Sequence, residues 1–92
     1  MDRHIKDILQ NLVKEPSLSE GYRTNKVKQF WHQKMPPSIA DRTSEIKVQN
    51  QTLYLKITSA ALKNELFNSR EKIIDLVNEF LGETAIIKVV LL

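Results

Sequence analysis

The sequence predicts an α+β domain in which helices cover one face of a three-stranded sheet. Two short runs within residues 45–58 alternate apolar and polar residues, as half-buried strands do. Residues 60–81 then carry apolar residues at helical spacing, and residues 85–92 are rich in Ile and Val. The predicted order of elements is α-α-β-β-α-α-β, a two-layer arrangement. Because the last strand follows a helix and not a hairpin turn, we expect it to complete a mixed sheet.

Two helices are expected in the N-terminal third. Apolar residues at positions i, i+3, i+4, i+7 and i+8 predict an amphipathic helix over about residues 2–14. Pro16 breaks that pattern, and residues 17–21 are expected to form a short connection. Thr24 or Asn25 can cap the second helix. The residues expected to anchor this helix to the core are Val27, Phe30 and Trp31.

The pair Pro36-Pro37 ends the second helix, because two successive residues there lack a backbone donor. Residues 38–40 are expected to form one short turn before the sheet. The first strand is predicted at residues 45–49 and the second at residues 53–58. Asn50-Gln51 lies between them as a tight turn, although Gln, unlike Gly, does not favour a positive φ.

A long helical segment follows the second strand. Ser59 is a good N-cap, because its hydroxyl can accept from an amide of the first helical turn. Asn68-Ser69 is a break at which Ser69 could cap a further helix. Gly82 ends the segment, since glycine adopts the left-handed conformation at little steric cost. The apolar stripe of this segment is predicted to comprise Leu62, Leu66, Ile73, Val77, Phe80 and Leu81.

Length and composition favour one small globular domain over residues 1–92. The chain is 41% hydrophobic and 27% charged, which is ordinary for such domains. It has no cysteine, which excludes disulfides and thiolate metal sites. No apolar run approaches the ~20 residues of a membrane span. The first residues also lack the apolar region of a signal peptide. We therefore expect a cytoplasmic protein without a membrane partner.

The net charge of +3 is unevenly placed. Residues 1–34 hold seven Lys/Arg against four Asp/Glu, whereas residues 35–92 hold seven against seven. A segment without any acid carries four candidate phosphate contacts, namely Arg23, Lys26, Lys28 and Lys34. The alternative is a solvated helix face. Trp31, within this segment, could stack on an unpaired base, but we expect it in the core.

A second group of candidates lies on the predicted sheet. Lys47, Tyr54 and Lys56 should share the face opposite the apolar strand residues, because successive strand residues alternate sides. Lys88 joins them if the last strand pairs in the register that turns its side chain to the same face. Such a face could receive nucleic acid or a partner protein, and the alternative is an ordinary solvated face.

An acidic stripe is predicted on the last helix. Glu71, Asp75 and Glu79 are four residues apart, so their carboxylates should lie one above another. Like charges at this spacing repel one another. The stripe could therefore meet a basic surface on a partner, and the alternative is a face that only confers solubility.

Catalysis has little support in the sequence. His4 and His32 are isolated, and neither lies in a metal-ligand pattern such as His-Glu-x-x-His. The chain has no phosphate-binding glycine loop and no nucleophile elbow. We therefore expect no enzyme activity, no metal, no cofactor and no small-molecule substrate.

Several segments, taken in order, carry a resemblance to a known family. The most specific are Ser59-x-Ala61-Leu62-x-x-Glu65-Leu66 and Asn78-x-x-Leu81-Gly82. Further segments are Trp31-x-x-x-Met35, Ile39-Ala40, Thr43, Leu53-x-Leu55-x-Ile57 and Arg70-x-x-Ile73-Ile74. Together, residues 5–92 resemble the DciA-like family of bacterial proteins. The chain departs from the family pattern at Pro36-Pro37, where most members have a Gly.

The resemblance implies a KH-like fold of the α-β-β-α-α-β kind, without the Gly-x-x-Gly loop of true KH domains. The chain agrees, because its only glycines are Gly21 and Gly82. Members bind the replicative DNA helicase, assist its loading, and bind DNA, here expected to be single-stranded or forked. Many members also carry a C-terminal extension, and functions resting on it are not carried over.

The matching motifs add two candidates for partner binding. Glu65 and Arg70 belong to the family-like segments, and they join the acidic stripe of Glu71, Asp75 and Glu79 as the candidate helicase-binding residues. Glu65 and Arg70 could instead hold the helix break together. Two other functions remain open: a free-standing KH-like binder of single-stranded RNA or DNA, and a protein–protein adaptor with no nucleic-acid role.

Overall fold

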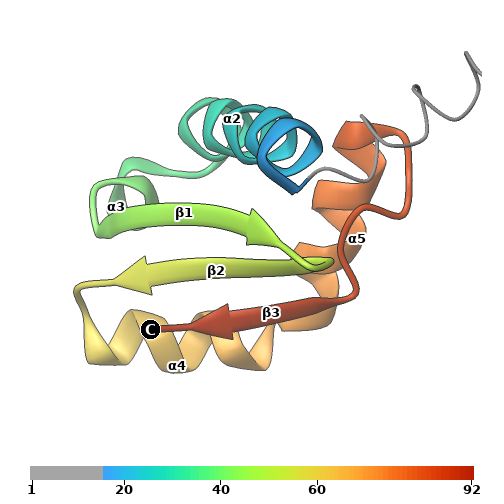
Figure 1. The fold of residues 1–92 in the computed structure, drawn as a ribbon. Helices are drawn as coiled ribbons and strands as arrows, with labels where there is room; N and C mark the ends of the chain where they lie inside the picture. Colours follow the sequence, from blue (N-terminus) through green and yellow to red (C-terminus); the bar gives the residue numbers. More distant parts are fainter. Residues whose placement is uncertain (1–15) are drawn as a thin grey trace, which may run out of the picture.

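The computed structural model describes residues 16–92, which form four helices and three strands (Figure 1). The helix expected over about residues 2–14 lies outside this range. The elements are α2 (Pro16–Lys34), α3 (Pro37–Ala40), β1 (Thr43–Gln49), β2 (Thr52–Ile57), α4 (Ala60–Asn68), α5 (Arg70–Leu81) and β3 (Lys88–Leu91). No helix within the described range is both long enough and apolar enough to cross a membrane.

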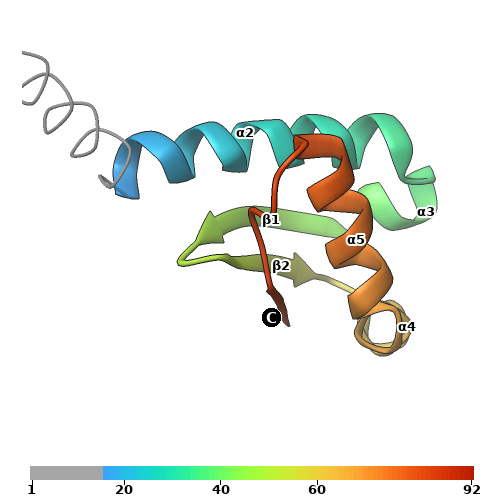
Figure 2. The ribbon, with the colours of Figure 1, turned by 90° about the vertical axis from the view of Figure 1, so that its right-hand side faces the viewer.

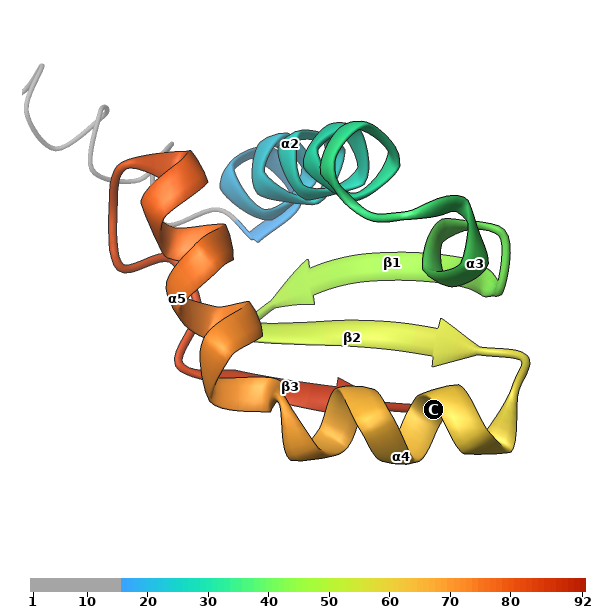
Figure 3. The same ribbon diagram turned by 180° about the vertical axis from the view of Figure 1, so that it is seen from behind.

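The three strands form one mixed sheet in the order β1-β2-β3. β1 pairs antiparallel with β2, and β3 pairs parallel with β2. Seen from behind, α4 and α5 lie in front of the strands, so both cover the same face of the sheet (Figure 3). α2 runs along the β1 edge, above the hairpin (Figure 2). This is the predicted two-layer α+β architecture, and the order from α2 onward contains the α-β-β-α-α-β series that the resemblance implies.

The core lies between the sheet and the helices. Trp31 is fully buried, which confirms its expected role as an anchor and leaves no room for it to stack on a nucleic-acid base. The rings of Phe30 and Phe80 lie 5.0 Å apart and join α2 to α5. The strands and the two C-terminal helices supply most other buried side chains: Ile46, Val48, Leu53, Leu55, Ile57, Leu66, Ile73, Val77 and Val89.

The start of α2 corrects one prediction. The helix begins at Pro16 and continues without a break to Lys34, so the connection expected over residues 17–21 is wrong. Proline is well suited to the first position of a helix, where its missing N–H has no partner to lose. Thr24 does not cap a helix either. Its hydroxyl instead accepts from the Val48 amide at 2.9 Å, which ties α2 to β1.

The turns agree with the predictions, with one exception. Asn50 and Gln51 connect β1 to β2 with φ of 52° and 57°, the left-handed pair that a two-residue hairpin requires. Gly82 ends α5 with φ of 71°. Ser59 caps α4, accepting from the Leu62 amide at 3.3 Å.

Ser69 is the exception, because it separates α4 from α5 without capping α5 through its side chain. Its backbone has φ of −105° and ψ of 16°, not the extended conformation in which an N-cap hydroxyl reaches the next turn. The reason is that Ser69 also ends α4, and its own amide donates to the Glu65 and Leu66 carbonyls.

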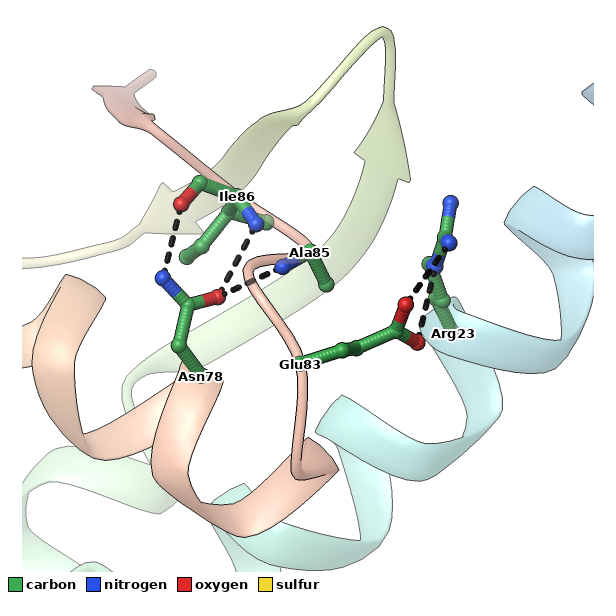
Figure 4. A network of polar contacts seen from close by, with 5 residues as sticks. All are labelled: Arg23, Asn78, Glu83, Ala85 and Ile86. Atoms are coloured by element: carbon green, nitrogen blue, oxygen red, sulfur yellow. Dashed lines mark hydrogen bonds and ion pairs between the residues drawn. The ribbon is translucent and has the colours of Figure 1, made fainter.

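The segment between α5 and β3 is held by Asn78 (Figure 4). Its carboxamide oxygen accepts from the Ala85 and Ile86 amides, both at 2.9 Å, and its nitrogen donates to the Ile86 carbonyl at 2.8 Å. Ala85 and Ile86 are buried, so these groups have little access to water. The bonds to Asn78 therefore take the place of strand pairing here. β3 accordingly starts at Lys88, later than the sequence predicts.

Candidate nucleic-acid interface

The sheet face turned away from α4 and α5 is polar and carries three lysines. Lys47 on β1 lies opposite Tyr54 on β2, and Tyr54 lies opposite Val90 on β3. Lys56 lies opposite Glu45, and Lys88 lies opposite Thr52. The parallel pairing therefore brings Lys88 to the same face as Lys47 and Lys56. This is the register in which the sequence predicts that Lys88 joins them. We call the set Lys47, Tyr54, Lys56 and Lys88 the open face.

The open face is accessible and carries a net positive charge. Its three lysines are exposed and Tyr54 is half-buried. No helix of the described chain crosses the strands in the view of Figure 1. The single ion pair within residues 16–92 lies elsewhere, so the ammonium groups of the open face are not paired by a carboxylate of this part of the chain. Glu45 is the one acid among the strand residues on this face.

A groove extends the open face toward α2. It has a volume of about 1010 Å³ and lies between α2 and β1. Lys28 and His32 line it from the helix, and Lys47 and Glu45 line it from the strand. Glu20 also lines the groove, and its carboxylate accepts from the Asn50 amide. Lys28 and Lys47 thus border the same groove, although they are 19 positions apart in the sequence.

The four cations of the segment 23–34 do not form one patch. Arg23 pairs with Glu83 at 3.1 Å (Figure 4), and Lys26 lies 5.7 Å from the centre of the Tyr22 ring. Lys26 and Lys28 are two residues apart in a continuous helix, so they point about 200° apart. Lys34 is exposed at the C-terminal end of α2. Only Lys28 of the four lines the groove.

The acidic stripe lies in the other layer. Glu71, Asp75 and Glu79 are all exposed on α5. Each is two residues from a position facing the core, Ile73 or Val77, and a helix turns about 200° over two residues. The stripe therefore points away from the sheet and from the open face. Glu65 is likewise exposed, on α4.

Arg70 holds the junction of the two C-terminal helices. Its guanidinium donates to the Phe67 carbonyl at 2.9 Å and lies 4.3 Å from the centre of the Phe67 ring. Of the two roles that the sequence left open for Arg70, this contact favours the structural one. The guanidinium remains exposed, so a partner could still reach it.

The sequence patterns did not predict two features of the protein surface. The side chain of Phe67 is 52% exposed, and Leu76 and Phe80 are each 37% exposed, so the C-terminal helices present apolar as well as acidic side chains. The pairing of Arg23 with Glu83 was also missed, because no sequence pattern links residues 60 positions apart. No cluster of three metal-ligating side chains occurs within the described residues, and His4 lies outside them.

Comparison with known proteins identifies one family. The profile of the family described as "Dna[CI] antecedent, DciA" matches residues 4–91, nearly the whole chain. Neither the curated proteins nor the solved structures gave a significant match. The match includes the segments that carried the resemblance in the sequence, from Trp31 to Gly82. The chain therefore belongs to the DciA family, which suggests a role in helicase loading during DNA replication.

Proposed function

We propose that this chain is a non-catalytic, single-domain accessory protein that binds DNA through one layer and the replicative helicase through the other. The observation that carries the proposal is the separation of charge. Lys47, Lys56 and Lys88 share a sheet face that no described helix covers, and the acidic stripe lies on the outer side of α5. Membership of the DciA family, which is associated with helicase loading, supports the choice of these two partners.

The DNA surface comprises the open face and the α2–β1 groove. Four lysines converge on it, three from the strands and Lys28 from α2, against the two carboxylates of Glu20 and Glu45. One of these carboxylates, that of Glu20, already accepts from the Asn50 amide. Each lysine that contacts a phosphate releases condensed counterions, so the affinity for DNA should fall as the salt concentration rises.

The helicase surface comprises the exposed charged residues of α4 and α5. Three like charges spaced four residues apart destabilise an isolated helix by a few tenths of a kcal/mol per pair. A basic patch on the helicase would relieve this repulsion. The exposed side chains of Phe67 and Leu76 would add apolar contact. The proposed contact residues are Glu65, Arg70, Glu71, Asp75 and Glu79.

The DNA surface is tested by charge reversal with a matched control. Lys47→Glu combined with Lys56→Glu should weaken the binding of a labelled single strand at least tenfold at low salt, measured by fluorescence anisotropy. Lys63→Glu combined with Lys72→Glu makes the same change of charge on the helical layer and should have a much smaller effect. Equal loss in the two pairs would mean that net charge alone matters, and would reject the open face.

The helicase surface is tested by light scattering after size exclusion of the chain mixed with the replicative helicase of its own host. The parent should co-elute with the helicase. The variant Glu71→Lys, Asp75→Lys, Glu79→Lys should elute separately, whereas Glu45→Lys, on the DNA side, should still co-elute. If the parent itself elutes separately at tens of micromolar, with and without DNA, the helicase role fails and the free-standing nucleic-acid binder becomes the better description.

A further inference from the structure

We propose that Tyr54 is a stacking platform for an unpaired base, so that the open face takes single-stranded DNA. This inference rests on the proposed DNA surface and adds the residue that would contact an unpaired base there. Tyr54 is the only aromatic residue in the three strands. It also lies on the central strand, β2, on the side that turns away from the core.

The neighbours of Tyr54 are arranged as a base-binding site requires. Lys47 lies directly opposite it on β1, and Val90 lies directly opposite on β3. Lys56 is two positions further along the same strand and therefore on the same face. Lys88, paired with Thr52, is its diagonal neighbour on β3. The residues that neighbour Tyr54 on this face of the sheet are thus three lysines and one valine.

These side chains match the two parts of a nucleotide. A base has an apolar π-face that stacks on an aromatic ring whatever its sequence, and the phosphates on either side of it are anionic. Val90 provides apolar contact beside the ring, and the lysines lie where phosphates would pass. In a duplex each base is already stacked between its neighbours, so the ring can act only on an unpaired base.

The size of the sheet limits how much DNA can be bound in this way. Neighbouring strands are about 4.8 Å apart, so three strands span roughly 10 Å. One ring on the central strand then stacks with a single base, and the flanking lysines contact the phosphates next to it. The site should therefore show little sequence preference, because stacking does not read hydrogen-bonding groups.

The inference is tested by removing the aromatic ring from the protein and, separately, the base from the DNA. Tyr54→Ala should weaken binding of an oligothymidylate about tenfold. It should leave the binding of an abasic strand of the same length and charge unchanged. Tyr54→Phe, which keeps the ring, should bind both strands like the parent. No loss on oligothymidylate, or an equal loss on both strands, would overturn the proposal.

A fluorescent variant provides a second reading in case Tyr54→Ala does not fold. Tyr54→Trp should be quenched by oligothymidylate and not by the abasic strand. The background is constant because Trp31 is the only other tryptophan and is fully buried. An unquenched indole in a variant that still binds the strand would exclude stacking at this position.

Failure of this inference differs from failure of the DNA surface itself. If reversing Lys47 and Lys56 leaves DNA binding unchanged, the open face is not the DNA surface, and the stacking site is rejected with it. If the lysine variants weaken DNA binding but the Tyr54 variants do not, the open face contacts only the phosphates of the DNA. The stacking site is then rejected, and the DNA surface is retained.

Discussion

The indole N–H of Trp31 donates to the hydroxyl of Thr43 at 2.9 Å, and that hydroxyl donates in turn to the Ile39 carbonyl at 2.9 Å. Three elements meet in this chain of two hydrogen bonds: α2, α3 and the start of β1. The indole is fully buried, yet its one polar group is satisfied. Trp31 therefore fixes the C-terminal end of α2 against the sheet by packing and by a directed bond.

Replacing Trp31 should be among the most destabilising changes in the chain. Trp31→Ala is expected to lower the free energy of unfolding by about 3–5 kcal/mol, because it leaves a large cavity. Thr43→Val should cost about 1–3 kcal/mol, since the buried indole N–H loses its acceptor, whereas the Ile39 carbonyl still accepts from the Arg42 amide. Urea denaturation followed by circular dichroism measures both. Gln29→Ala, at an exposed position of α2, is the control and should stay within about 0.5 kcal/mol.

Asn78 should matter more than its position near a helix end suggests. Asn78→Ala is expected to cost about 2–4 kcal/mol, because it leaves three polar groups of a buried segment without a partner. Asn78→Asp keeps the acceptor for both amides but loses the donor to Ile86, so its cost should be smaller. Thermal or urea unfolding compares these variants with Asn64→Ala on the exposed side of α4. Equal costs for Asn78→Ala and Asn64→Ala would contradict the role assigned to Asn78.

The two glycines should respond to alanine with opposite signs. A Cβ at either position meets no atom within 4 Å, so only the backbone conformation decides. Gly21 lies inside α2, and Gly21→Ala should stabilise the chain by about 0.5–1 kcal/mol. Gly82 has φ of 71°, and Gly82→Ala should destabilise by about 1 kcal/mol or more. Shifts of the same sign in denaturant midpoint would show that one of these conformations is misassigned.

Lys26 and Lys28 should differ in their effect on DNA binding, because only Lys28 lines the groove. Lys28→Gln is expected to reduce the slope of log K against log salt by about 0.7 for a single strand, the loss of one phosphate contact. Lys26→Gln removes the same charge on the other side of α2 and should leave the slope unchanged. Anisotropy titrations at four salt concentrations measure the slopes. Equal changes would contradict the special role of Lys28, and a larger change for Lys26→Gln would place the DNA on the outer side of α2 and not in the groove.

Local signals made several elements predictable. Pro36-Pro37, Ser59 and Gly82 each act within one turn of the chain, and each begins or ends a helix where the sequence placed it. The unbroken course of α2 was not predictable in this way. Pro16 predicts a break and residues 17–21 a short connection. Thr24 and Glu20, however, accept from the amides of Val48 and Asn50 and hold the helix beside the hairpin. Those contacts join residues at least 24 positions apart.

The candidate site was only partly predictable for the same reason. The alternation of strand residues was enough to place Lys47, Tyr54 and Lys56 on one face. The spacing of cations in the segment 23–34 was not enough to tell which of them reach the same surface. That depended on where α2 begins and on the pairing of Arg23 with a carboxylate far along the chain.

The hydrogen bonds of Asn78 also determine which charges the sheet presents. Strand residues alternate between two faces, so a slip of β3 by one position would turn Lys88 into the core and Val89 into solvent. Asn78 binds the amides of Ala85 and Ile86, and the amide of Ile87, the residue just before this strand, donates to the Gln51 carbonyl. Asn78, a residue of α5 on the other side of the sheet, thus helps to determine which side chains of β3 lie on the open face. Changes at Asn78 can therefore alter the charge pattern of a surface that Asn78 never touches.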